Sequence, residues 1–283
     1  MDSLPSFVSF NADRVRTPIV LSVPHAGRAY PPDCTTLTRV GLDRLIRLED
    51  RYADQLAERC NVAGYHLIIA QVPRLWIDLN RAETDVDAQM IDPPLRAPSS
   101  VSHKVRSGLG LVPRRLSGVG DIWRARLSRD DLVTRILTAH RPYHAAVAAA
   151  LALARNRFGG ALLIDLHSMP PLMTDSPADI VIGDRFGRSA DTRMAEVARV
   201  ICEAAGFRVA LNTPYPGGYL IERHGRPADN IHALQLEVDR RLYLDESLTE
   251  PASGLEIIQE LILSVTVALA AEIQSSNYAE AAE

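Results

Sequence analysis

Four residues in this sequence carry side chains suited to metal binding or acid–base chemistry: His25, Asp50, His167 and Glu237. Three of them directly follow apolar segments that are typical of buried strands. In open α/β sheets, ligands bind at the carboxyl ends of strands, so residues distant in sequence can converge there. Two imidazoles and one carboxylate suit a catalytic zinc ion with one position left for water, and a further carboxylate is the usual general base.

Two of these residues have polar neighbours with strand spacing. Asp165 lies two residues before His167, so on a strand both side chains point to the same face, where a carboxylate can orient a ligand imidazole. Gln235 and Asp239 share a face with Glu237 in the same way. Polar residues on a buried strand are costly unless they line a cavity, which makes Glu237 the candidate general base. The alternative for Glu237 is a structural ion pair.

Two further segments offer groups for binding a substrate. Asn80 and Arg81 end a predicted strand, where an amide and a guanidinium fork could bind a carboxylate; Arg74 begins that strand. Gly217 and Gly218 lie in a tight loop that either presents backbone N–H groups to a ligand or only turns the chain.

The acidic metal ligand has alternatives. Asp50 opens a predicted helix, where Glu49 and Asp54 also favour the positive end of the helix dipole. A rival pair, His140 and His144, has helical spacing, but a proline lies between the two and no glutamate follows His140 as in zinc protease helices. We therefore expect His144 to line the pocket rather than to bind metal.

Short apolar segments alternate with longer helical patterns, which predicts a single α/β domain over residues 1–283, with a mostly parallel mixed sheet flanked by helices. The predicted strands are 18–23, 66–72, 75–79, 161–166, 179–182, 208–211 and 232–238. The predicted helices are 48–60, 129–158, 190–205 and 254–275, with a cap at Ser128, an interruption at Pro142 and a stop at Gly159 and Gly160. Residues 277–283 are expected to form a frayed tail.

The segment 82–127 breaks this alternation and is rich in Pro, Gly and Ser. It carries one acidic residue after position 95, Asp121, against seven basic ones: Arg96, Lys104, Arg106, Arg114, Arg115, Arg124 and Arg126. A basic loop in an acidic protein indicates a lid over a small anionic substrate; the alternative is a solvated, mobile insertion.

The composition and net charge exclude some classes of protein. The chain has 283 residues, 47% hydrophobic and 23% charged, and its net charge of −4 argues against a nucleic-acid binder. It contains no secretory signal pattern and no apolar run long enough for a membrane span. Three scattered cysteines fit a reducing compartment, so we expect a cytoplasmic protein. The oligomeric state is left open.

Read together, several segments resemble the N-formylglutamate amidohydrolase family, in the same order from about Val20 to Leu244. They are Pro24–Gly27, Arg74–Arg81, Tyr143–His144, Asp165–Ser168, Asp179–Gly183, Asn212–Gly218 and Gln235–Glu237. The family looks like a branch of the zinc carboxypeptidase and aspartoacylase fold. The resemblance implies one zinc ion held by His25, an acidic residue and His167, with Glu237 as the base.

The resemblance also implies that Asn80 and Arg81 bind the substrate carboxylate and that Arg74 polarises the acyl oxygen. The acidic ligand matches best at Asp50, with Glu49 as the alternative. Two features depart from the family pattern: Ala26 stands where a serine is usual, and the basic loop differs.

The expected activity is zinc-dependent removal of a formyl or short acyl group from an N-acyl amino acid, foremost N-formylglutamate, a compound of histidine breakdown. The alternatives are a zinc carboxypeptidase acting on small peptides and a metal-free binding protein of the same fold. Glutamate specificity requires a second cation, for which the sequence leaves six candidates unranked: Arg114, Arg115, Arg124, Arg126, Arg223 and Arg226.

Overall fold

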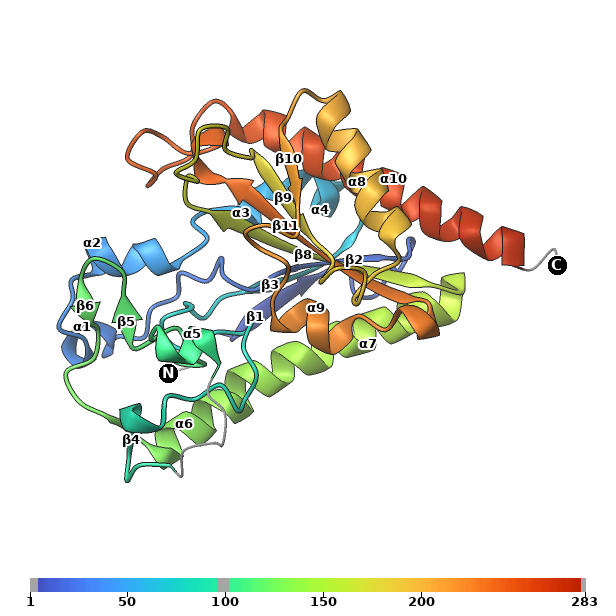
Figure 1. Cartoon of the computed structure of the whole chain (residues 1–283). Coiled ribbons are helices and arrows are strands. Elements are labelled where there is room, and N and C mark those ends of the chain that lie inside the picture. The colour runs from blue at the N-terminus through green and yellow to red at the C-terminus, as the bar shows by residue number, and fades with distance from the viewer. Residues whose placement is uncertain (1–4, 96–101, 281–283) are drawn as a thin grey trace. The chain divides into compact units, whose positions relative to one another are not determined.

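The computed structural model describes residues 5–95 and 102–280. Its main sheet has seven strands: β1 (Phe7–Phe10), β2 (Ile19–Val23), β3 (His66–Ala70), β8 (Ala161–Met169), β9 (Ile180–Gly183), β10 (Val209–Leu211) and β11 (Ile231–Asp239). Their order is β1-β3-β2-β8-β11-β9-β10 (Figure 1). Strand β2 is parallel to β3 and β8, β8 is parallel to β11, and β10 is parallel to β9, whereas β9 and β11 are antiparallel. The predicted mixed, mostly parallel sheet is therefore confirmed.

The chain folds into two compact units whose segments alternate along the sequence. The described part of the first unit comprises residues 5–8, 24–50, 70–95 and 102–145, and that of the second comprises 9–23, 51–69 and 146–280. The expectation that residues 1–283 act as one catalytic domain stays a prediction.

The second unit contains most of the sheet and the helices that flank it. These helices are α3 (Ala53–Leu56), α4 (Glu58–Val62), α8 (Thr192–Ala204), α9 (Tyr219–His224) and α10 (Leu255–Glu280), with short 3-10 turns η4 (Pro227–Asp229) and η5 (Arg240–Leu242). Helices α8 and α10 pack on each other, α10 also contacts β2 and β8, and α9 contacts β8 and β11. Every residue of β2, β8 and β11 is buried, as expected for strands covered on both faces. Helix α10 includes residues 277–280 of the predicted tail 277–283, so these four are helical, and residues 281–283 lie outside the described residues.

The first unit contains short elements joined by irregular chain. They are α1 (Cys34–Leu37), α2 (Leu42–Leu45), η1 (Ile46–Leu48), η2 (Ala88–Met90), β4 (Ile91–Asp92), α5 (His103–Arg106), β5 (Arg115–Leu116), β6 (Gly120–Asp121), β7 (Leu127–Ser128), α6 (Arg129–Arg135) and the π-helical turn η3 (Ile136–His140). Strand β4 pairs with β7 and β5 with β6. The described parts of the segment 82–127, namely 82–95 and 102–127, are thus largely irregular, as predicted, and residues 96–101, which include Arg96, lie outside the described residues.

The predicted helix 129–158 is present as a chain of three helical elements that ends with α7 (Arg141–Phe158). Ser128 Oγ accepts the predicted capping bond from Asp131 N at 3.0 Å. Pro142 has no N–H, and its ring would clash with the carbonyl four residues earlier, at Thr138. The turn that contains Thr138 is π-helical, which relieves this conflict. Gly159, at φ +79°, ends the helix as predicted.

Two predicted elements are wrong. Residues 75–79 form a turn and irregular chain rather than a strand, although Leu75, Ile77 and Leu79 are buried. Their alternation reflects burial of every second side chain without strand pairing. The helix predicted at 48–60 is broken, because Tyr52 has a left-handed φ of +56° before α3 begins. Asp50 therefore lies in irregular chain and not in the first turn of a helix.

Within residues 5–95 and 102–280, no helix combines the length and apolar character needed to cross a bilayer. Cys34, Cys60 and Cys202 are buried free thiols. Burial raises the pKa of the Cys60 thiol to about 11 and that of Cys202 to about 12. These thiols are therefore protonated near neutral pH.

Candidate metal centre

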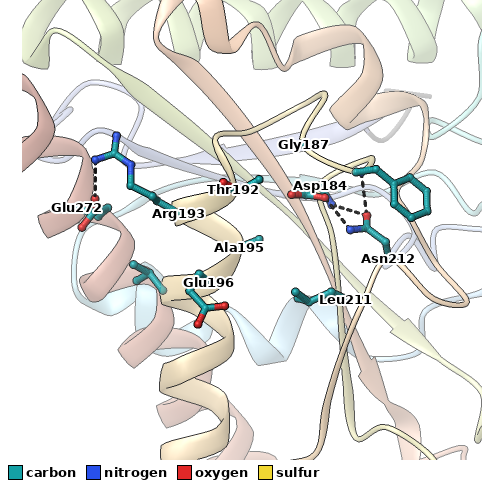
Figure 2. Close-up of a pocket in the computed structure, with 11 residues that line it drawn as sticks. Asp184, Gly187, Thr192, Arg193, Ala195, Glu196, Leu211, Asn212 and Glu272 are labelled. Atoms are coloured by element: carbon teal, nitrogen blue, oxygen red, sulfur yellow. Dashed lines mark hydrogen bonds and ion pairs between the residues drawn. The ribbon is translucent and has the colours of Figure 1, made fainter.

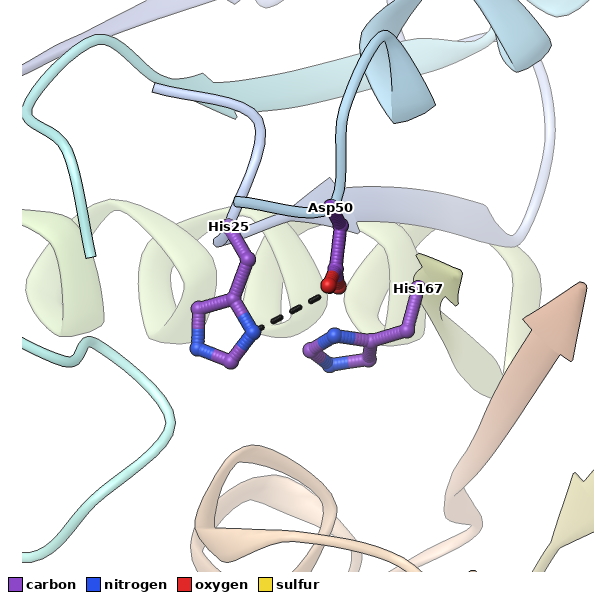
Figure 3. Close-up of side chains that lie close together, drawn as sticks. All are labelled: His25, Asp50 and His167. Atoms are coloured by element: carbon purple, nitrogen blue, oxygen red, sulfur yellow. Dashed lines mark ion pairs between the residues drawn. The ribbon is translucent and has the colours of Figure 1, made fainter. Parts of the chain in front are cut away.

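The three predicted metal ligands come together. His25, Asp50 and His167 each offer one ligand atom, and these atoms all lie within 4.8 Å of one another (Figure 3). All three side chains are buried, and His25 Nδ1 is 3.4 Å from Asp50 Oδ2. Buried groups of this kind are costly unless they are paired or bind a metal, so this set could hold a metal ion. The alternative ligand Glu49 accepts a hydrogen bond from Tyr30 Oη at 2.6 Å and is not a member of the set.

Close backbone packing fixes the loop that carries His25. This residue follows β2 at its carboxyl end, and its carbonyl oxygen accepts a bond from Asp50 N at 3.0 Å, which ties the two ligand residues together. Two residues later, a Cβ added at Gly27 would lie 1.9 Å from the carbonyl oxygen of Val72. Only glycine fits this approach without a shift of the backbone.

A buried carboxylate, Asp78, orients His25 and binds two arginines. His25 Nε2 donates to Asp78 Oδ1 at 2.7 Å, Arg74 Nε donates to Oδ2 at 2.9 Å, and Arg81 Nη2 is 3.8 Å from Oδ2. Burial raises the pKa of Asp78, but Arg74, Arg81 and His25 outweigh that effect and hold the pKa well below its usual range. The ionised carboxylate therefore holds a proton on Nε2 and turns Nδ1 toward Asp50.

Asp78 was not predicted as a site residue. It lies inside the apolar segment 75–79, which we had interpreted as a strand. An ionisable residue in the middle of an apolar segment, four residues after an arginine, was the signal that could have identified it.

The residues predicted to bind the substrate carboxylate lie in a turn rather than at a strand end. Arg81 Nε donates to the Leu109 carbonyl at 2.9 Å, and Arg81 Nη1 donates to the Asn80 carbonyl at 2.6 Å. His144 Nε2 donates to the Leu79 carbonyl at 3.0 Å. The substrate-binding roles of Asn80, Arg81 and His144 stay predictions, and neither His140 nor His144 belongs to the group of potential metal ligands.

In the second unit, the carboxyl ends of β8 and β11 place His167 beside the predicted base. The strands are parallel, and Glu237 is the register partner of His167, as Gln235 is of Asp165. His167 Nε2 donates to Asp165 Oδ2 at 3.0 Å, which is the orienting contact expected from the sequence. Adjacent in-register side chains on one face lie close together.

Glu237 is held by its neighbour two residues earlier. Gln235 Nε2 donates to Glu237 Oε1 at 2.7 Å, and Gln235 Oε1 accepts from Gly218 N, also at 2.7 Å. The N–H of Gly218 is thus engaged with Gln235. Gly217 has φ +121°, which favours glycine, and its predicted role in substrate binding, like that of Gly218, stays a prediction.

Several of the candidate cations for a substrate side chain have partners of their own. Arg114 pairs with Asp87 at 2.6 Å, and Arg115 pairs with Asp121 at 2.9 Å. Arg226 pairs with Asp229, Arg223 donates to Tyr219 Oη, and Arg124 donates to the Thr38 carbonyl. These contacts do not single out one of the six.

A separate pocket of about 650 Å³ lies in the second unit beside the start of α8 (Figure 2). Its polar lining includes Asp184, Thr192, Arg193, Asn212 and Glu272. Asn212 Nδ2 donates to Asp184 Oδ1 at 2.8 Å, and Arg193 Nη1 is 3.7 Å from Glu272 Oε1. The residues that line this pocket include none of the predicted site residues.

Comparisons with family models, curated sequences and solved structures all match proteins of one family. A family model described as N-formylglutamate amidohydrolase matches residues 17–244. An N-formylglutamate deformylase of Pseudomonas putida is 30% identical over 271 residues, covering 91% of this chain and 95% of the relative. An N-formylglutamate deformylase of Pseudomonas aeruginosa is 28% identical over 253 residues, covering 87% of each. The crystal structure of N-formylglutamate amidohydrolase from Ralstonia eutropha JMP134 superposes with a TM-score of 0.86 at 32% identity, covering 94% of this chain and 98% of that one.

Proposed function

Because this chain belongs to the N-formylglutamate amidohydrolase family, we propose that it hydrolyses the amide bond of N-formylglutamate to give glutamate and formate. The observation that carries the proposal is the buried group of His25, Asp50 and His167. Two imidazoles and one carboxylate are the ligands of a catalytic zinc site, whereas calcium and magnesium sites are built from oxygen ligands. We therefore assign one zinc ion to this group.

When bound, zinc would lower the pKa of a water molecule to about 7, as in the best-studied site, and polarise the acyl oxygen. Glu237 accepts the proton of the attacking water in this proposal. Gln235 supports that role because its donor at 2.7 Å fixes one oxygen of the Glu237 carboxylate. Glu237 then passes the proton to the leaving amine as the C–N bond breaks, which releases formate and the amino acid.

Arg74 and the turn that follows it supply the remaining groups. Arg74 is assigned to the acyl oxygen, where one preorganised donor is typically worth about 3 kcal/mol of transition-state stabilisation. Asn80 and Arg81 are assigned to the α-carboxylate of the substrate. Two backbone carbonyls and Asp78 already fix the plane of the Arg81 guanidinium, so little side-chain entropy would be lost on binding.

The test is formate release from N-formylglutamate by the purified protein, measured before chelation, after chelation and after zinc is added back. Bound metal is counted by elemental analysis on the same samples. We expect release that a chelator abolishes and zinc restores. Stoichiometric zinc without formate release would contradict the substrate but not the metal site, whereas a protein with neither metal nor activity would contradict both.

Two parallel assays address the alternatives. A dipeptide panel that yields free amino acids, with no formate release from N-formylglutamate, would indicate a carboxypeptidase. Substrate binding that is unchanged in metal-free, inactive protein would indicate a binding protein.

A further inference from the structure

Two buried histidines of the first unit bond the backbone on either side of Asn80. His144 Nε2 is 3.0 Å from the carbonyl oxygen of Leu79, and His140 Nε2 is 2.8 Å from the carbonyl oxygen of Arg81. A carbonyl oxygen can only accept a hydrogen bond, so both imidazoles carry a proton on Nε2 and donate it.

The turn formed by residues 79–81 is held by side chains and not by a strand partner. Its three consecutive carbonyls each accept from a side chain, since Arg81 Nη1 bonds the carbonyl of Asn80 between the two histidine bonds. On the N–H side, Asn80 N donates to Asp78 Oδ1 at 2.9 Å. Buried backbone polar groups need hydrogen-bond partners, and at residues 79–81 side chains supply them in place of a neighbouring strand.

The helical segment 136–158 presents the two imidazoles to this turn. His140 ends the π-helical turn η3, His144 lies in the first turn of α7, and their ring centroids are 4.4 Å apart. Both residues are at most 1% exposed. A π-helical turn is rare and occurs frequently at functional sites. The π-helical turn η3 thus ends at His140, the residue whose side chain donates to the Arg81 carbonyl.

We propose that His140 and His144 are positioning residues that hold the turn of residues 79–81, and with it the Asn80 and Arg81 side chains, for the α-carboxylate of the substrate. This inference rests on the proposed function. It also assigns His144 a contact with the protein backbone, where the sequence had suggested a pocket-lining residue.

The test compares two substrates that differ in the α-carboxylate alone: N-formylglutamate and 4-formamidobutyrate. His140→Leu and His144→Leu remove the donors, whereas His140→Gln and His144→Gln place an amide donor near the position of Nε2. We expect each leucine variant to lower kcat/KM for N-formylglutamate about 10- to 100-fold, or about 1.4–2.8 kcal/mol at 1.4 kcal/mol per tenfold, mainly through KM, because the groups that bind the α-carboxylate are displaced. The glutamine variants should recover most of this loss.

The second substrate separates positioning from general damage. For 4-formamidobutyrate, kcat/KM of every variant should stay within about twofold of the wild-type value, because no α-carboxylate is bound. Zinc content should be unchanged. His66→Leu is the matched control: His66 is also buried and also makes one Nε2 bond, to Ser9 Oγ at 2.9 Å, but on strand β3. It should leave the ratio of the two kcat/KM values unchanged.

An equal loss for both substrates, or no rescue by glutamine, would overturn the inference. If a leucine variant folds poorly, His144→Asn replaces it, because its shorter amide does not reach the Leu79 carbonyl. Active wild-type protein with unaffected histidine variants overturns the positioning role alone. Wild-type protein that releases no formate overturns the proposed function, and this inference with it.

Discussion

At the residue scale, Glu237 offers the most direct test of the proposed chemistry. Glu237→Gln keeps the shape of the side chain and removes its ability to take a proton. We expect kcat for formate release to fall about 10²- to 10⁴-fold, the usual contribution of a general base. Zinc content should not change, because Glu237 is not a member of the group proposed to hold the ion.

The control for this variant is Asp239→Asn, on the same strand and face but paired with Arg241. It should retain wild-type turnover. A Glu237→Gln enzyme that keeps both zinc and most of its turnover would refute the assignment of the base.

Replacement of Asp78 should lower both the stability of the protein and its affinity for zinc. Asp78→Asn leaves Arg74 and Arg81 without their shared buried counter-charge and weakens the orientation of His25. We expect the unfolding free energy of the metal-free protein to drop by about 3–5 kcal/mol, as when one partner of a buried ion pair is removed. Zinc affinity should fall about 10- to 100-fold, because Asp78 orients a ligand.

Urea denaturation and competition with a metal indicator measure these two effects. Asp121→Asn, an exposed acidic residue paired with Arg115, should alter neither. If Asp78→Asn binds zinc as tightly as the wild type, the orienting role of this carboxylate is wrong.

The sequence was sufficient to predict that His25 and His167 come together in a group that could hold a metal, because each follows a buried apolar segment and the carboxyl ends of parallel strands meet. Asp50 was chosen over Glu49 only through the family resemblance. The helix predicted to begin near both residues does not form there, so helix position could not have decided between them. Asp78 escaped prediction because its contacts are made by residues three, four and 53 positions away in the chain. The local pattern marks Asp78 as a buried carboxylate near an arginine, but only the fold brings His25 to it.

At the element scale, β2, β8 and β11 were predictable because most of their buried positions are apolar, as is usual for parallel strands covered on both faces. The segment 75–79 has the same alternation as a strand, and only the absence of pairing in the described sheet distinguishes it. The break at Tyr52 was not predictable, because a left-handed tyrosine has no sequence signature.

The loop after β2 gives a prediction at this scale. Gly27→Ala would place its Cβ 1.9 Å from the carbonyl oxygen of Val72, so the loop that carries His25 has to move. We expect a loss of about 1–3 kcal/mol in unfolding free energy, the usual cost of overpacking, and weaker zinc binding. Thermal denaturation and zinc titration measure the two effects.

Gly64→Ala is the matched control for this loop. Gly64 has φ +86°, so alanine is strained there, but its Cβ would meet no atom within 4 Å. This variant should lose some stability and keep wild-type zinc affinity. Equal zinc affinity in Gly27→Ala and Gly64→Ala would contradict the role of the Gly27 loop.

At the scale of the whole molecule, a buried histidine should make stability depend on pH. Burial, together with the positive charges of Arg223 and Arg226, lowers the pKa of His224 to about 3. The unfolded chain, with a histidine pKa near 6.5, therefore binds a proton in the range where the folded chain does not. The contribution of His224 to the unfolding free energy is therefore complete above about pH 6.5 and is lost as the pH falls toward 3.

Unfolding free energies of metal-free protein at pH 7.5, 6 and 5 measure this dependence. The wild type should lose up to about 1.4 kcal/mol per pH unit from this group below pH 6.5. His224→Phe should flatten the slope, and His103→Gln, at an exposed position, should not. Parallel curves for wild type and His224→Phe would show that His224 is not the group responsible.

The pairing of β2 with β8 also affects how the chain is made. Ser22 and Asp165 are hydrogen-bonded across these strands although 143 residues separate them. At a synthesis rate of about 5–20 residues per second, β2 leaves the ribosome roughly 7–29 s before the residues that complete its pairing. Throughout that interval an apolar strand edge lacks its permanent neighbour, and unpaired edges are templates for aggregation. We therefore expect residues 19–23 to be the part of the emerging chain that needs protection from association until β8 has been made.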